Sequence, residues 1–302
     1  MKPKVDEMVD DCPAGKTVIL AGSGRSGTTW VQEIINYNNL FRTLFEPFHS
    51  KKVDSLSHWH YRQYLRSSNN LPEFATPARN IIEGNTTNTW INKFNKNSTS
   101  SKQLIKDIRI NLCLNWMYHN FKDLPVILLL RHPCAVAYSR LRLGWKTHLQ
   151  DFLVQDDLVN DFLLPHKKEI EECDDIFNMH IFMWCIENIV PLTQFNRGEI
   201  HIVFYENICL ETESEIMKIF NYIDEPYSQL ALNSSFKPSA TSHSRDTSAS
   251  EGNHVHLWKK HLTGTQINSA KSICDSFGLG KLYGHDDLPI YNNEEIFTLF
   301  PY

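Results

Sequence analysis

The sequence predicts an α/β fold in which helices flank a central parallel sheet. Residues 18–21 form a short apolar run with the β-branched content of a buried parallel strand, and residues 125–130 form a second one. A helical pattern follows each run: apolar residues recur at helix-face spacing from Trp30 onward, and Pro133 suits the first position of a helix. Strands that alternate with helices in this way are typical of parallel sheets.

The rest of the chain continues this alternation. We expect further strands at 44–49 (ending at Pro47), 103–107 and 200–206, and helices at 110–121, 176–195, 213–222 and 265–277. A short helix is expected over 58–64, either as part of an insertion over the active face or as a surface helix with aromatic packing. Residues 234–253, rich in Ser, Thr and His, predict a flexible loop or lid. Residues 1–15 read as a polar lead-in, and residues 16–302 as a single domain.

Composition narrows the class of protein. The 302 residues have a formal net charge of −5, which argues against nucleic acid as a general partner. No apolar run reaches the roughly 20 residues that span a bilayer, so we expect no membrane association. The seven cysteines are scattered, as in a protein of a reducing compartment, and no export signal is recognised at the N-terminus. We therefore expect a soluble cytoplasmic protein without a metal site.

A glycine-rich turn joins the first strand to its helix. Its glycines allow a tight bend whose N–H groups, with the positive end of the helix, form a cradle for an anion. The spacing from Gly22 to Gly27 matches the P-loop of nucleotide-binding proteins, which predicts a P-loop-like three-layer fold. Thr28 stands where that loop has its lysine, and the positive charge lies inside the loop at Arg25. Such a loop suits a less charged group than a γ-phosphate with magnesium.

Two segments resemble the donor site of sulfotransferases, which use 3′-phosphoadenosine 5′-phosphosulfate (PAPS). The run Arg25-Ser26-Gly27-Thr28-Thr29 resembles their 5′-phosphosulfate loop, and Arg131 with Ser139 eight residues later resembles their 3′-phosphate site. The resemblance implies PAPS as co-substrate, no metal, and donor contacts from Gly24, Arg25, Ser26, Gly27, Thr28, Thr29, Arg131 and Ser139. Two further similarities are weaker. The run Val203-Phe204-Tyr205-Glu206-Asn207 resembles a late strand of the family and implies a donor contact from Tyr205. The Ser-rich segment followed by Trp258-Lys259 resembles a late segment of protein-tyrosine sulfotransferases and implies donor contacts from Ser244 and Lys259.

The general base is implied by the same resemblance. Cytosolic phenol and steroid sulfotransferases carry a histidine in a Leu-Ile-Lys-Thr-His segment, but here Lys106 is followed by Asp107. Glycan 6-O- and protein-tyrosine sulfotransferases place a glutamate after the first helix, and Phe45-Glu46-Pro47 is similar to that pattern. The resemblance therefore implies Glu46 as base, with His49, Asp107 or a lid residue as alternatives. Arg25 and Lys106 would stabilise the leaving phosphate.

The sequence thus favours in-line sulfuryl transfer to a hydroxyl or amine-type nitrogen of a small molecule. The acidic residues between 151 and 175 fit a solvated helix face, or a negative rim that attracts a cationic acceptor. Two alternatives stay open at this point. A divergent P-loop kinase would use ATP and magnesium, and a non-catalytic nucleotide-binding module would need no base.

Overall fold

The computed structural model describes residues 17–96, 100, 102–237, 239–240 and 255–300. Its centre is a sheet of five parallel strands in the order β2-β3-β1-β4-β5. The strands are β1 (Thr17–Gly22), β2 (Arg42–Phe45), β3 (Gln103–Asp107), β4 (Val126–Leu130) and β5 (His201–Phe204). Because all five run the same way, their carboxyl ends share one edge of the sheet. This edge is where open α/β sheets bind ligands.

The sheet is buried on both faces, and side-chain alternation divides it between two hydrophobic cores. In β4, Val126, Leu128 and Leu130 face one core, while Ile127 and Leu129 face the other. All five residues are at most 1% exposed. This explains why β4 reads in the sequence as an unbroken apolar run rather than as an alternating strand.

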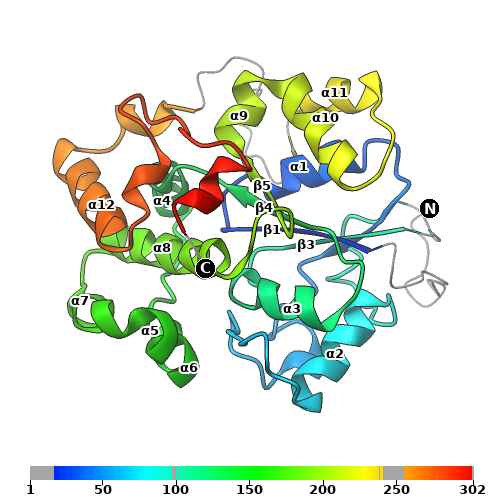
Figure 1. Ribbon diagram of the computed structural model, residues 1–302, viewed down its shortest axis with the longest axis horizontal. Helices are drawn as coiled ribbons and strands as arrows, with labels where there is room; N and C mark the ends of the chain where they lie inside the picture. The colour runs from blue at the N-terminus through cyan, green and yellow to red at the C-terminus, as the bar shows by residue number, and fades with distance from the viewer. Residues whose placement is uncertain (1–16, 97–99, 101, 238, 241–254, 301–302) are drawn as a thin grey trace.

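Helices cover the two faces unequally (Figure 1). In that view, one face carries α1 (Thr28–Ile35), α9 (Tyr205–Leu210), α10 (Thr212–Tyr222) and α11 (Gln229–Ser235). The larger core lies under α2 (Pro72–Ile82), α3 (Leu114–Asn120), α4 (Pro133–Arg142), α8 (Ile176–Gln194) and α12 (Gly264–Ser276). Three short helices, α5 (Gln150–Leu153), α6 (Asp156–Leu158) and α7 (Lys167–Glu172), lie beyond α8.

Short irregular helices connect these elements. They are the 3₁₀ helices η3 (Asp54–Leu56), η4 (Asn111–Cys113), η6 (Leu164–His166), η8 (Leu257–Lys260), η9 (Gly280–Leu282) and η10 (Glu295–Thr298), and the π-helix η5 (Val159–Leu163). No helix in the described part of the chain combines the length and the apolar character needed to cross a bilayer.

The predicted α/β class and parallel sheet are confirmed, whereas the helix predicted over 58–64 is wrong. That segment forms turns, and two of its backbone groups bond to a distant side chain, Gln155. The Tyr64 N–H donates to Gln155 Oε1 at 2.8 Å, and Gln155 Nε2 donates to the Arg62 carbonyl at 2.9 Å. Its aromatic residues Trp59 and Tyr64 are nevertheless buried, at 5% and 4% exposure.

Candidate functional site

A cavity of about 380 Å³ lies at the carboxyl edge of the sheet. Each of the five strands delivers a cavity-lining residue just beyond its end. These residues are Arg25 after β1, Glu46 after β2, Ile108 after β3, Arg131 after β4 and Tyr205 after β5. The parallel topology therefore gathers side chains that are up to 180 positions apart in the sequence.

The glycine-rich turn forms one wall of the cavity. Gly27 precedes α1 with φ = 101°, and a Cβ atom there would lie 2.7 Å from the Tyr205 ring. A Cβ on Gly24 would lie 2.7 Å from the Trp145 ring. The first α1 backbone bond back to this turn runs from Val31 N–H to the Gly27 carbonyl, so the preceding N–H groups have no acceptor within the helix. The wall is thus a helix N-terminus suited to an anion.

Two arginines from neighbouring strand ends meet at this wall. Arg25 Nε donates to Ser139 Oγ at 3.0 Å, and Arg131 Nη1 donates to the Arg25 carbonyl at 3.1 Å. The Arg131 guanidinium also lies 4.1 Å from the centre of the Tyr205 ring. Arg131 Nε and Ser26 Oγ are buried without a hydrogen-bond partner among the described residues. Of these two residues Arg131 lines the cavity, and its guanidinium suits the oxygens of a bound phosphate or sulfate.

Glu46 lies in a buried ion cluster at the carboxyl ends of the neighbouring strands β2 and β3. Its carboxylate accepts from Lys106 Nζ at 2.8 Å and from Arg109 Nη1 at 2.6 Å, and all three side chains are at most 7% exposed. Burial by itself would raise the pKa of the Glu46 carboxyl, but the two cations outweigh it and lower the pKa to about 2. Glu46 is therefore ionised throughout the physiological range.

The backbone of Arg25 and of Glu46 has an unusual conformation. Six described residues other than glycine have positive φ, and four of them are Asn or Asp, which tolerate this conformation. The other two are Arg25 (φ 79°) and Glu46 (φ 45°), and both line the cavity. Residues held in this region are common at ligand sites, because the surrounding structure fixes them there.

The two alternative bases sit in different surroundings. Burial and the nearby Arg109 lower the pKa of His49 to about 4, so its ring is neutral at pH 7. Burial raises the pKa of Asp107 to about 6, although Arg109 opposes this shift. Both Asp107 oxygens accept backbone N–H groups, from Phe48 and from Arg109, each at 2.8 Å. Asp107 is thus engaged in holding the turn that follows β3.

Most of the residues implied by the resemblance line this one cavity: Arg25, Gly27, Thr28, Thr29, Glu46, Lys106, Arg131, Ser139 and Tyr205. Gly24 and Ser26 belong to the same turn but lie behind its inner surface. Lys259 is not among the lining residues, and its ammonium group pairs with Asp287. Ser244 lies outside the described residues. Within the described part of the chain, no group of three or more His, Cys, Asp and Glu side chains is placed to hold a metal ion.

The sequence reasoning missed several cavity residues. Arg109 could have been recognised from the sequence as a cavity residue, because it follows the end of a strand just as Arg131 does. Trp90, Trp145 and Lys237 could not, since they lie on irregular segments that enter the cavity only through the tertiary fold. Trp90 donates its indole N–H to the Glu46 carbonyl at 3.2 Å, which fixes it beside the ion cluster.

Comparisons with known proteins bear on this site. The model of the family described as "Sulfotransferase domain" matches residues 16–285. The fold is similar to the sulfotransferase domain from the Synechococcus PCC 7002 olefin synthase, with 14% identity, a TM-score of 0.50 and coverage of 85% of this chain and 94% of that one. Mouse sulfotransferase SULT7A1 complexed with PAP has 12% identity, a TM-score of 0.47 and coverage of 91% and 87%. Retinol dehydratase in complex with androsterone and PAP has 13% identity, a TM-score of 0.44 and coverage of 90% of this chain and 82% of that one. No curated protein sequence matches significantly.

Proposed function

The chain belongs to the sulfotransferase family, and we propose that it transfers a sulfuryl group from PAPS to a hydroxyl or amine-type nitrogen of a small molecule. The observation that carries the proposal is the convergence of Arg25, Arg131 and Ser139 in a cavity that Glu46 also lines. The two cations suit a donor with two anionic ends, and the carboxylate suits proton removal from an acceptor.

In this proposal Arg131 and Arg25 bind the two anionic ends of PAPS. Arg131, with its unpaired buried Nε, would bind the 3′-phosphate together with the Ser139 hydroxyl. The N–H groups at the start of α1 and the Arg25 side chain would hold the phosphosulfate end. Trp30 lines the same cavity and packs edge-on against Tyr205, with ring centres 5.5 Å apart. These rings offer an apolar surface for the adenine.

The chemical step is a single displacement at sulfur. The acceptor oxygen or nitrogen bonds to the sulfur, the bond from sulfur to the bridging oxygen breaks, and the acceptor proton passes to Glu46. A carboxylate with a pKa of about 2 is a weak base, and Lys106 is one cause of that low value. If Lys106 turns from Glu46 to the bridging oxygen, it both stabilises the leaving phosphate and raises the basicity of Glu46.

The acceptor end of the cavity is aromatic and cationic. Phe45 and Trp90 line it, and the Lys93 ammonium lies 5.5 Å and 5.7 Å from the centres of their rings. The Lys52 ammonium lies 5.6 Å from the Trp90 ring. The four buried charges on Glu46, Lys106, Asp107 and Arg109 balance one another, and Lys52 and Lys93 add two cations beside the aromatic rings. This arrangement favours an acceptor with an anionic group.

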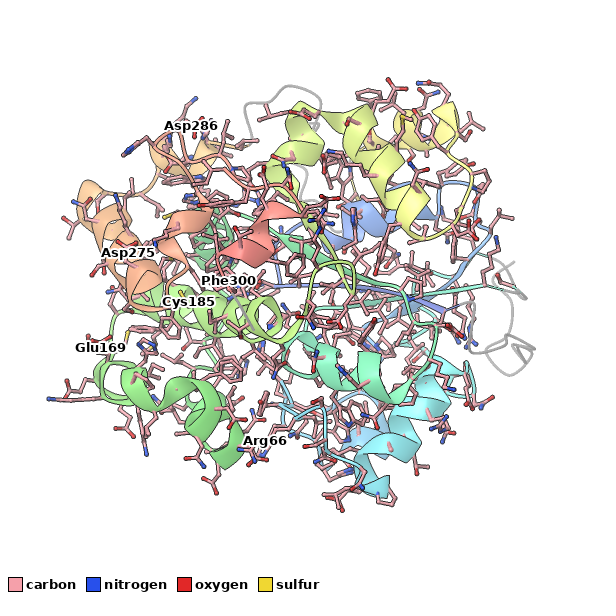
Figure 2. The ribbon with its side chains drawn as sticks, in the orientation of Figure 1. Arg66, Glu169, Cys185, Asp275, Asp286 and Phe300 are labelled. Atoms are coloured by element: carbon pink, nitrogen blue, oxygen red, sulfur yellow. The ribbon has the colours of Figure 1, made fainter. Side chains whose placement is uncertain are left out.

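The acidic stretch between 151 and 175 contributes no residue to the lining of the cavity, where the sequence suggested a cationic acceptor. Arg66 pairs with Asp157 at 2.8 Å and with Asp161 at 2.7 Å. Along α7, Lys167 pairs with Glu171 and Lys168 with Glu172. Figure 2 shows Arg66 and Glu169 at the outer edge of the molecule, away from the sheet. The described contacts therefore favour the solvated-face interpretation.

Binding of the desulfated donor, 3′-phosphoadenosine 5′-phosphate (PAP), tests the assignment of the donor site. We expect PAP to bind the wild-type protein and Arg131→Ala to raise its Kd by at least about 10-fold, because a charge-assisted contact to the phosphate is lost. Isothermal titration calorimetry measures both values. Arg197→Ala, at an exposed arginine that pairs with Glu294, is the control and should leave the Kd unchanged. Equal affinity in R131A and wild type would remove Arg131 from the site.

Substitution of Glu46 tests the base. Glu46→Gln keeps the side-chain shape but cannot take up the proton, so turnover of PAPS with any accepted acceptor should fall about 100-fold. PAP binding should persist, which shows that the variant is folded. Glu213→Gln, at an exposed helix position on α10, is the control. Turnover near that of wild type would rule out Glu46 as base. The non-catalytic alternative predicts no PAPS turnover in wild type either.

The pH profile separates the three candidate bases. A carboxylate loses its basic form only when the pH falls through its pKa, so a base at Glu46 should leave kcat/KM constant from pH 8 down to 5. A midpoint near pH 6 would instead indicate Asp107. An acid limb near pH 4 that Glu46→Gln does not change would indicate His49. Initial rates at saturating donor, with circular dichroism at each pH, make the distinction.

Matched phenols test the charge of the acceptor. At equal concentration we expect 4-hydroxyphenylacetate to be sulfated faster than neutral 4-ethylphenol, and tyramine slowest, because lysines flank the aromatic end. Lys93→Met should reduce the preference for the carboxylate several-fold. Sulfated products are quantified by mass spectrometry. A preference for tyramine would instead support the cationic acceptor.

A further inference from the structure

A buried triad of charges lies behind the cavity wall. Glu187 of α8 accepts from Arg140 of α4 at 2.8 Å and pairs with Arg62 Nε at 2.7 Å. Their side chains are at most 6% exposed, and none is among the residues that line the cavity. Burial would raise the pKa of the Glu187 carboxyl, but Arg140 and Arg62 outweigh it and lower that pKa. Glu187 is therefore a buried anion held between two cations.

The triad reaches the glycine-rich turn through two hydrogen bonds. Arg140 Nε donates to the Gly24 carbonyl at 3.1 Å. The neighbour of Glu187 on α8, Asn188, donates from Nδ2 to Ser23 Oγ at 3.2 Å. Gly24 immediately precedes Arg25, which carries its side chain into the cavity from a left-handed backbone conformation. Helix α8 thus holds Ser23 directly, through Asn188, and Gly24 indirectly, through the pairing of Glu187 with Arg140 of α4.

We propose that Glu187 is a positioning residue of the donor-binding turn: it orients Arg140 so that Nε holds the Gly24 carbonyl, and so fixes Arg25. This inference rests on the proposed function, in which that turn binds PAPS. Apolar residues of similar volume can stabilise a core as well as buried charges do. What they cannot supply is a directed donor to a backbone carbonyl, and Arg140 can be buried at that place only with its charge balanced by Glu187.

The test is a double-mutant cycle read out by PAP binding, which needs no knowledge of the acceptor. We expect Glu187→Gln to raise the Kd for PAP about 10-fold, and Arg140→Lys, which keeps the charge but loses the Nε donor, to do the same. Because Glu187 acts through Arg140, the double variant should bind PAP no more weakly than R140K alone. A general loss of stability would instead give additive effects.

Two control variants complete the design. Glu215→Gln removes another buried carboxylate, one that pairs with Lys218 on α10 far from the turn, and should leave the Kd unchanged even if the melting temperature falls. Arg197→Ala removes an exposed cation that pairs with Glu294 outside the triad, and should also bind PAP normally.

The outcomes separate the two proposals. Absence of PAP binding by the wild-type protein would refute the proposed donor site itself. Binding by wild type with an unchanged Kd in E187Q, or strictly additive effects in the cycle, overturns the positioning role. If E187Q does not fold, R140K decides alone: a wild-type Kd in R140K also overturns the role, and a raised Kd with E215Q unaffected supports it.

Discussion

The site depends on the parallel run of five strands that all end at one edge of the sheet. Each strand end releases the chain into the same small volume, and four of the five deliver a charged side chain to the cavity within three residues: Arg25, Glu46, Arg109 and Arg131. The cost of this convergence is buried charge, which has to be paired or bound. Glu46 balances Lys106 and Arg109, whereas the Arg25 side chain donates to Ser139 and Arg131 donates to the Arg25 carbonyl. In the proposed function the two arginines bind the anionic donor and Glu46 takes up the proton of the acceptor.

The residues packed behind the glycine-rich turn also include buried charges that are paired with one another. The glycine-rich turn has little side-chain bulk of its own, so its shape is set by what packs on it. Trp145 and Ile108 close over Gly24, and Tyr205 closes over Gly27. Arg140 then holds the Gly24 carbonyl from inside, with Glu187 as its counter-charge. A turn built from small residues is thus made rigid by large ones that come from distant parts of the chain.

Local sequence signals were sufficient for the elements whose character is set by burial. The apolar run of β4 is recognisable because the strand is wholly buried, and the long apolar helix α8 because 13 of its 19 residues are buried. The glycine-rich turn was recognisable because its backbone requires small residues at fixed spacing. The segment around Tyr64 was not predictable in this way, since Gln155, more than 90 positions away, provides its hydrogen bonds. For the same reason the pairing of Arg109 with Glu46, and the triad around Glu187, could not be anticipated from spacing along the chain.

The ion pair between Lys259 and Asp287 bears on how Lys259 could contact a bound phosphate. The same aspartate lies 3.6 Å from the imidazole of His132, which directly follows the cavity residue Arg131. His132 in turn stacks on Trp258, with ring centres 4.5 Å apart. An internal carboxylate therefore already occupies the ammonium group that the resemblance assigns to the nucleotide. Recruitment of Lys259 by a phosphate would therefore be an exchange of one anion for another.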